Sequence, residues 1–451
     1  MDSTDSATVA PLMDLKNIKT NTAQRIETDV LDPVVINDDF CRFTLINKGY
    51  LNHASRITLA IDTAVSSHLP LNVGIDALIS RAVLKFSNRV VSEISDFGHL
   101  SKIMMMVRGN QFLRNREQFF SGKMINHEVI YGNTKATHLD GEYLSLDNGM
   151  AYDTRNASHE LIKTRPELKL NNAPVFSILL SELFPFFDKL KTFPLFMCKD
   201  QINIELHFTP KVNRCCAVQT AGATDAFKIK TDAVKMIADY IFYNDELMAK
   251  DEAQMNAGNG TKWNYDDFRL SKYSVGQAEI QSGLKRNVGG AGLLVSKLYA
   301  SLTKPQTVNN GTLLNDYNSV YGTTGATVDI NIRYNNKPLF TTDKRNPSTI
   351  QHYLIESLGG LLNVNKTEYS DSGALFDDNK KYEEQVMKTQ LAGNFFTQGF
   401  NLTNIERIDT NGIEYQYKVS AVPDENFVQR VFLQVQRYAV LKDGHLTCYY
   451  Y

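Results

Sequence analysis

Hydrophobic and polar residues alternate along residues 201–208, which read QINIELHF. The apolar side chains at 202, 204, 206 and 208 fall on one face of an extended chain, and the polar side chains between them fall on the other. This pattern predicts a half-buried β-strand. A second apolar stretch, MIADYIFYN at 236–244, predicts another strand after a loop at 211–228.

The same arrangement recurs close to the C-terminus. Residues 413–419, IEYQYKV, again alternate, and the apolar stretch 431–440, VFLQVQRYAV, follows them. The chain therefore predicts one β-unit that is built twice.

Shorter elements surround both units. In the first half, apolar runs predict strands at 40–46, 55–61, 80–86 and 175–180, and helices at 96–107 and 181–190. Asp96 and Ser181 are the expected N-caps of these helices, since their side chains can accept hydrogen bonds from free backbone N–H groups. Residues 108–172 predict short strands linked by long surface loops. In the second half we predict strands at 269–281, 292–303 and 328–334, a helix at 348–357, and an insertion at 358–393 with a helical stretch at 379–391.

The length of 451 residues is too great for a single core and suits two domains. Residues 1–36 contain six acidic and three basic residues with few large apolar ones, which predicts an arm that becomes ordered only on another surface. Strand-rich halves with long loops fit an all-β fold made of two jelly-roll sandwiches. We therefore predict an N-terminal arm at 1–36, a first jelly roll at 37–250, a linker at 251–264 and a second jelly roll at 265–451.

The overall charge limits the partners that the chain can be expected to bind. Forty-eight basic and 50 acidic residues give a net charge of −2, which argues against direct DNA binding. The five cysteines are scattered and odd in number, so we expect reduced thiols. The first residues, MDSTDSATVAPLMD, lack the basic and apolar regions of a signal peptide, and no stretch reaches the length of a membrane span. These features predict a protein kept in a reducing, aqueous compartment.

A search for catalytic and metal-binding patterns finds none. A two-domain cupin would need His-x-His and further ligands, but the nine histidines never stand in that spacing. His207 lies on the polar side of its strand and is expected to be solvated or at an interface, and His127-Glu128 has no partner at a usable spacing. The glycines at 289, 290 and 292 predict a flexible turn, because no phosphate-binding motif accompanies them. We therefore expect no enzyme activity, no catalytic or metal-binding residues and no cofactor.

Three stretches resemble one family of viral proteins. The run FPLFMCKDQINIELHF at 193–208, followed by IADYIFYNDE at 237–246, resembles the end of the first jelly roll in double jelly-roll major capsid proteins of the large nucleocytoplasmic DNA viruses. The C-terminal RYAVLKDGHLTCYY and Tyr451 resemble the closing strand pair of that family, with Ala439 where an asparagine is usual. The length is closer to that of the virophage and Polinton-like virus members.

The resemblance implies a structural role. Members of this family form homotrimers whose six jelly rolls make a pseudo-hexagonal capsomer. These capsomers tile an icosahedral shell around double-stranded DNA, together with penton and minor capsid proteins. By this resemblance the chain is expected in the virion capsid after assembly inside the host cell, without sequence-specific nucleic-acid binding. The alternative is a two-domain β-sandwich attachment protein, such as a fibre or adhesin, which would be a monomer or small oligomer with an exposed aromatic site.

Overall fold

A computed structural model of the chain describes most of the predicted strands. The described residues are 25–62, 67–70, 73–105, 120–121, 143–145, 175–188, 190, 192–210, 217–218, 228–303, 307–309, 312–314, 319–320, 328–339, 353, 356–357, 392–393, 398–402, 412–422 and 426–450. The predictions for residues 1–24, for most of 108–172, for most of the helix at 348–357 and for nearly all of the insertion at 358–393 lie outside these residues.

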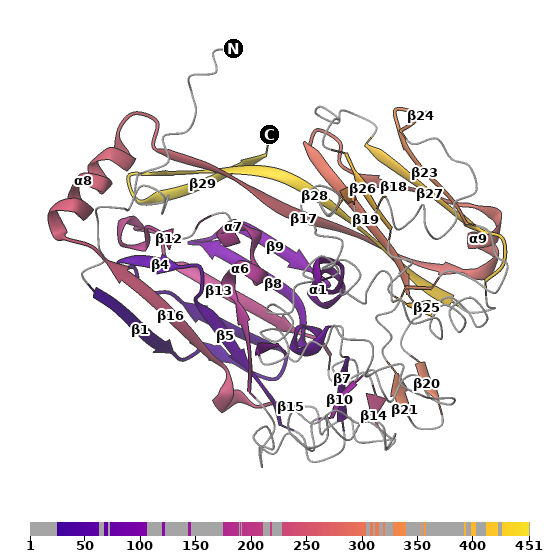
Figure 1. Cartoon of the computed structure of the whole chain (residues 1–451), viewed down its shortest axis with the longest axis horizontal. Coiled ribbons are helices and arrows are strands. Elements are labelled where there is room, and N and C mark those ends of the chain that lie inside the picture. The colour runs from indigo at the N-terminus through magenta and orange to yellow at the C-terminus, as the bar shows by residue number, and fades with distance from the viewer. Residues whose placement is uncertain are drawn as a thin grey trace, which may run out of the picture.

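Two antiparallel sheets form the first half (Figure 1). The first sheet has the order β11 (Phe176–Leu179), β5 (Arg56–Leu59), β16 (Lys235–Phe242), β4 (Tyr50–Asn52) and β12 (Thr192–Phe193), and β1 (Arg25–Leu31) also pairs with β16. The second sheet has the order β2 (Val35–Ile36), β3 (Phe40–Thr44), β13 (Ile202–Phe208), β8 (Ile79–Phe86) and β9 (Arg89–Ser95).

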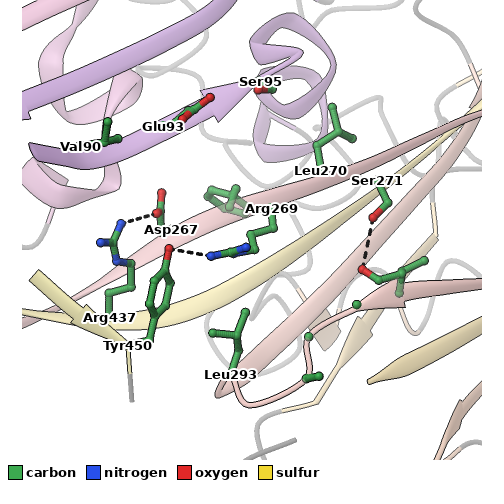
Figure 2. Close-up of a pocket in the computed structure, with 15 residues that line it drawn as sticks. Val90, Glu93, Ser95, Asp267, Arg269, Leu270, Ser271, Leu293, Arg437 and Tyr450 are labelled. Carbon is green, nitrogen blue, oxygen red and sulfur yellow. Dashed lines mark hydrogen bonds and ion pairs between the residues drawn. The ribbon is translucent and has the colours of Figure 1, made fainter. Parts of the chain in front are cut away.

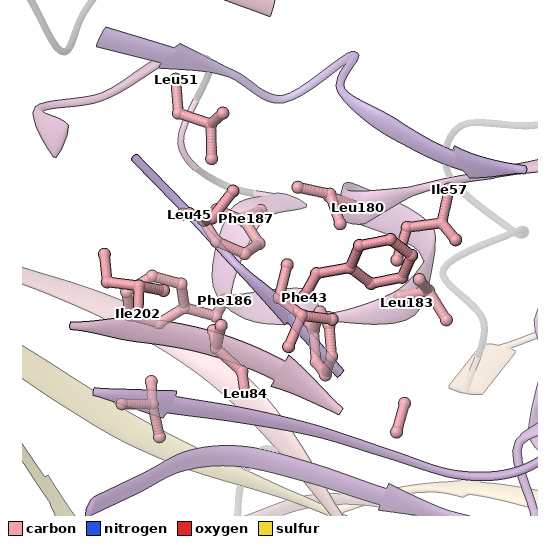
Figure 3. Packing of buried hydrophobic residues seen from close by; sticks show 14 of the residues in the cluster. Phe43, Leu45, Leu51, Ile57, Leu84, Leu180, Leu183, Phe186, Phe187 and Ile202 are labelled. Atoms are coloured by element: carbon pink, nitrogen blue, oxygen red, sulfur yellow. The ribbon is translucent and has the colours of Figure 1, made fainter. Parts of the chain in front are cut away.

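The core of the first half lies between these sheets, as the alternation at 201–208 predicted. Ile202, Ile204, Leu206 and Phe208 of β13 are all buried, and the residues between them are partly exposed. Figure 3 shows Ile202 among side chains from the second sheet and from two short helices that follow β11. Burial of such aliphatic and aromatic side chains is the main stabilising contribution to a fold of this kind.

The predicted helix at 181–190 is instead two short helices. They are α6 (Leu180–Leu183) and α7 (Pro185–Asp188), so Ser181 lies inside a helix and is not its N-cap. Pro185 explains the interruption, because proline has no N–H to continue a helix but is well suited to begin one. The other predicted helix is α1 (Phe97–Met105), which begins directly after Asp96 as expected.

The second half is a second sandwich of two antiparallel sheets. One sheet has the order β17 (Thr261–Gly276), β28 (Asn426–Lys442), β19 (Val295–Thr303), β22 (Ser319–Val320) and β25 (Ala392–Gly393), with β26 (Gln398–Asn401) on β19 and β29 (His445–Tyr450) on β28. The other sheet has the order β18 (Leu284–Gly289), β27 (Ile413–Val419), β23 (Val328–Tyr334) and β24 (Lys337–Pro338). The strand predicted at 269–281 ends at Gly276, and residues 277–282 form α9 (Gln277–Ser282).

Small ribbons complete the described part of the chain. β6 (Ile61–Asp62) pairs with β15 (Lys228–Ile229), β7 (Ser67–Pro70) pairs with β10 (Tyr143–Ser145) and β14 (Ala217–Val218), and β20 (Thr307–Asn309) pairs with β21 (Thr312–Leu314). The strand β14 therefore lies within the stretch at 211–228 that was predicted to be a loop.

The predicted doubling of one β-unit is confirmed. In the first half, β13 and β16 are separated in the chain only by the short strands β14 and β15 among the described strands, and they lie in opposite sheets of one sandwich. In the second half, β27 and β28 follow one another among the described strands and also lie in opposite sheets. Each pair thus contributes one central strand to each wall of its core.

Two segments differ from the predicted domain organisation. The described part of the predicted arm, 25–36, forms β1 and β2, which pair with β16 and β3 of the same chain, so these residues need no other molecule for their order. The segment predicted as a linker contains the end of α8 (Asp245–Asn256) and the start of β17. Trp263 within it is buried in the first core, so this stretch joins the two halves as packed structure.

Candidate functional site at the junction of the two halves

The three-stranded ribbon of β17, β28 and β29 extends from the second sandwich over the first (Figure 1). Along β28, Val431 and Leu433 are buried in the second core, whereas Ala439 and Leu441 are buried in the first. One continuous strand therefore has its side chains in both cores. This arrangement fixes the halves to one another through hydrophobic packing on both sides of the junction.

A buried ion pair lies beneath this ribbon. Arg437 on β28 donates from Nη1 to Asp267 Oδ2 on β17 at 2.8 Å and to the carbonyl oxygen of Val91 at 2.7 Å. Tyr265 donates its hydroxyl proton to the same carbonyl at 2.8 Å, and Ser92 donates from Oγ to Asp267 Oδ1 at 3.1 Å. Burial raises the pKa of Asp267, although Arg437 opposes that shift.

The backbone of β9 explains why these side chains meet at Val91. Leu84 is opposite Ser92 and Lys85 is opposite Val90, so Val91 is an extra residue without a partner on β8. A β-bulge of this kind turns backbone groups out of the ladder. The carbonyl of Val91 is thus available to Arg437 and Tyr265, which satisfy a buried polar group.

A second ionic contact joins the halves at Asp96. Arg430 on β28 donates from Nε to Asp96 Oδ2 at 2.8 Å, and Lys272 Nζ lies 3.0 Å from the same oxygen. Arg430 also donates from Nη1 to Thr303 Oγ1 at 2.6 Å. Although burial favours the neutral carboxyl, the neighbouring cations, above all Arg430, lower the pKa of Asp96 to about 2. The predicted N-cap residue therefore also links the first sandwich to the second.

The tip of the β28–β29 hairpin is bound to the first sandwich. Lys199 N–H donates to the Gly444 carbonyl at 2.8 Å, and Leu446 N–H donates to Asp200 Oδ2 at 3.3 Å. Burial opposes ionisation of Asp200, but hydrogen bonds from His445, Ser87 and Leu446 lower its pKa. Gly444 has φ +86°, and a Cβ there would lie 2.8 Å from the Met197 carbonyl oxygen. The hairpin tip thus requires glycine.

A cavity of about 700 Å³ opens beside this junction. Its walls come from β9, β17, the turn after β18 and the C-terminal strands (Figure 2). Arg269 donates to the Tyr450 hydroxyl at 2.8 Å, and the guanidinium carbons of Arg269 and Arg437 lie 5.0 and 4.4 Å from the centre of the Tyr450 ring. Arg437 therefore contacts both Asp267 and Tyr450. Its ion pair with Asp267 and its cation–π contact with Tyr450 hold the C-terminal strand in place.

Comparison with known proteins gives no match by sequence and clear matches by structure. No family model matches the chain, and no curated protein matches it. The quasi-atomic model of the PBCV-1 virus capsid matches with a TM-score of 0.56 and 10% identity, and covers 96% of this chain and 97% of that chain. The cryo-EM structure of the Sputnik virophage matches with a TM-score of 0.54 and 9% identity, over 95% and 89%. The crystal structure of the mavirus major capsid protein matches with a TM-score of 0.53 and 10% identity, over 100% and 96%.

The chain has a double jelly-roll fold. The fold class predicted from the sequence is therefore confirmed, as is the resemblance to capsid proteins of the large DNA virus and virophage lineage.

The residues weighed as site candidates are dispersed in the double jelly roll. His207 is half-buried on β13, with its ring 5.0 Å from that of Phe40, and loss of hydration lowers its pKa. Cys41 and Cys198 are buried free thiols. The glycines at 289–292 do form a turn beside the cavity, whereas His127-Glu128 lies outside the described residues.

Among the described residues, no three His, Cys, Asp or Glu side chains are grouped so that they could hold a metal ion. No helix in the described part of the chain is long and apolar enough to cross a membrane.

Sequence reasoning missed the junction residues. Arg437 did carry a usable signal, because it stands between the buried Val435 and Ala439 on the inward side of β28. A charged residue at such a position needs a buried partner. Asp267 on β17 was that partner, but its register opposite β28 could not be read from the sequence.

Proposed function

We propose that this double jelly roll is the major capsid protein of a virus in the large DNA virus, virophage and Polinton-like virus lineage. The observation that carries the proposal is the reciprocal full-length match. The match to the mavirus major capsid protein covers 100% of this chain and 96% of that one.

We propose further that three copies form a pseudo-hexameric capsomer. Side chains of the strand β28 are part of both cores. The two sandwiches therefore behave as one rigid block with two similar lobes. Three such blocks around a threefold axis present six similar lobes, which suits hexagonal packing in a closed shell. Such capsomers would tile an icosahedral capsid around double-stranded DNA, with penton and minor capsid proteins as partners, after assembly inside the host cell.

A structural role without catalysis fits the chemistry of the junction. Asp267 is held by Arg437 and Ser92, and Asp96 by Arg430 and Lys272. Charged groups that are paired in this way are typical of contacts that hold a fold together. We propose domain bounds that follow the cores: a first jelly roll from β1 to α8, and a second from β17 onward, whose C-terminal ribbon returns to the first.

Light scattering on the purified protein tests the capsomer directly. We expect a stable species of three times the 50.9 kDa chain mass, and electron microscopy of concentrated samples should show hexagonal particles or shells. A folded monomer at micromolar concentration would count against the capsomer. The alternative attachment protein predicts that result together with binding to immobilised glycans.

A further inference from the structure

The strand β1 forms one edge of the first sandwich. It pairs with β16 along its whole length, from Arg25 opposite Phe242 to Leu31 opposite Met236. The other side of β16 carries β4 and β5, and among the described residues no strand pairs with the outer edge of β1. This edge lies at the end of the molecule away from the second sandwich (Figure 1).

Exposed aliphatic side chains are concentrated on and just after this edge strand. Ile26 is 67% exposed and Val30 is 63% exposed, although β-branched residues of this size are usually buried. Both face outward next to Ile241 and Ile237 of β16. Of the ten most exposed large hydrophobic residues in the described part of the chain, four lie between 26 and 35: Ile26, Val30, Val34 and Val35.

Within the described residues, neither a bulge nor a proline protects this edge against another strand. Natural edge strands are commonly blocked by a bulge, a proline or charged side chains. The register of β1 with β16 shows no bulge, and β1 contains no proline. Its two acidic residues, Glu27 and Asp29, are turned to the other face, where Lys48 Nζ lies 2.9 and 2.8 Å from their carboxylates.

We propose that β1 pairs antiparallel with β1 of a second copy of this chain, in a twofold-symmetric contact centred on Thr28. The inference rests on the proposed function, in which this contact would link neighbouring capsomers. It joins the two first sandwiches into one continuous sheet. The pairing is of the isologous kind, in which one surface patch meets the same patch on its partner.

The outer face of β1 is self-complementary in this register. Ile26 of one copy lies opposite Val30 of the other, and Val30 of the first copy lies opposite Ile26 of the second; such apolar cross-strand pairs are stabilising. On the inner face, Glu27 of each copy lies opposite Asp29 of the other, which is unfavourable for like charges. Lys48 of each copy contacts both carboxylates and Arg25 adds a second cation, so the joined rows remain neutral. Arg25 is diagonal to Asp29 of the second copy, within reach of a long side chain. This neutrality favours a second copy over a partner with a strand of one charge sign.

The contact is expected to be weak for one pair of copies. A seven-residue strand edge buries much less than the roughly 1,200–2,000 Å² of a stable complex. In a shell, the same contact would recur around every capsomer, so that small contributions add through multivalency. A weak, repeated contact also allows incorrectly placed capsomers to detach.

Cysteine cross-linking tests the register. In antiparallel pairing, opposed residues have Cα atoms about 4.5–5.5 Å apart, within the range that a disulfide can span. We expect Thr28→Cys to form a disulfide-linked dimer under mild oxidation in concentrated or assembled samples. Ile26→Cys and Val30→Cys should cross-link when the two variants are mixed, and much less when each is alone. Val175→Cys, with 51% exposure at a site outside β1, is the matched control.

A pair of lysine substitutions tests the same contact without new covalent chemistry. Ile26→Lys with Val30→Lys should weaken association between capsomers roughly tenfold in sedimentation, through lost apolar pairs and new repulsion. The mass of the isolated capsomer and its melting temperature should stay unchanged. Val175→Lys, as control, should leave association unchanged.

The outcomes separate this inference from the proposed function. Trimers that form shells while Thr28→Cys cross-links no more than Val175→Cys would overturn the β1 contact and leave the capsid role standing. A Thr28→Cys cross-link that forms only after residues 2–24 are deleted would also overturn it, since the chain's own N-terminal segment would then occupy the edge. Cross-linking at Thr28 in a protein that never trimerises would support the contact and count against the capsomer.

Discussion

Arg430 and Asp96 are 334 positions apart in the sequence, and Arg430 Nε donates a hydrogen bond to Asp96 Oδ2 at 2.8 Å. Arg430 belongs to β28 of the second sandwich, and Asp96 precedes α1 of the first. Asp96 has φ +52°, a left-handed conformation that is unusual for a residue other than glycine. The ion pair at this backbone turn is thus one of the contacts that join the two sandwiches.

Loss of the Arg430 guanidinium should therefore destabilise the whole chain. We expect Arg430→Met to lower the free energy of unfolding by about 2–4 kcal/mol, because it leaves the Asp96 carboxylate with Lys272 as its remaining cation. Arg81→Met is the control, since Arg81 and Glu93 form an exposed pair worth about 0–1 kcal/mol. Urea unfolding measures both. Equal losses in the two variants would contradict the role given to Arg430.

The depressed pKa of Asp96 predicts a specific pH dependence. A carboxyl whose pKa in the folded state is about 2, below its ordinary value of 3.8, stabilises the fold above the ordinary value and loses that contribution as the pH falls towards 2. Asp96→Asn should therefore be less stable than the unmodified protein at pH 6, and the difference should shrink between pH 4 and pH 2. Denaturant midpoints across this range measure it. A difference that stays constant with pH would show that Asp96 contributes through packing alone.

The hairpin tip at Gly444 should not tolerate a side chain. Gly444→Ala places a Cβ 2.8 Å from the Met197 carbonyl oxygen and 2.7 Å from Lys199 Cγ, in addition to the strain of φ +86°. We expect a loss of about 2–4 kcal/mol. Gly258→Ala is the matched control, because Gly258 has φ +59° but no atom within 4 Å of the added Cβ, so it should lose about 1–2 kcal/mol from backbone strain. Thermal unfolding of both variants distinguishes steric conflict from strain.

Sequence periodicity predicted the strands whose two faces differ. β27 has the predicted bounds, and β13 begins one residue after the predicted start, because one face of each strand is buried and the other is not. The predicted strand at 431–440 is shorter than β28. Phe432 and Leu433 are both buried, so this part of the strand has no polar face, and the residues at the ends of the strand show little alternation of apolar and polar side chains. The order of the elements was enough to predict a double jelly roll.

The junction could not be predicted in the same way. Contacts such as Arg437 with Asp267 depend on the register between strands 170 residues apart, which no local pattern encodes. The role of residues 25–36 was missed for a related reason. β1 is an edge strand with exposed aliphatic residues and acidic residues that face Lys48, so its composition is that of a solvated segment although its backbone is paired.

Deletions of two lengths separate the sheet strand from the segment before it. Removal of residues 2–24 leaves β1 intact, so the melting temperature and the number of copies in each capsomer should stay unchanged. Removal of residues 2–31 also removes β1, exposes the edge of β16 and leaves Lys48 without Glu27 and Asp29. We expect this longer deletion to lower the melting temperature of the first sandwich by at least about 5 °C, since each kcal/mol lost shifts a domain of roughly 150–250 residues by about 2–4 °C.

The shorter deletion also tests the predicted bridging role of the N-terminal segment. Residues 1–24 include Leu12, Met13, Leu15 and Ile18, whose spacing suits docking on a surface supplied by another subunit or a minor capsid protein. Shells of the 2–24 deletion should therefore close less often in electron micrographs, while their capsomers remain normal. Normal shells at normal yield would remove the bridging role. A shorter deletion that fails to fold would place residues 1–24 within the subunit itself, because a segment that acts only between capsomers cannot be needed for the fold of one chain.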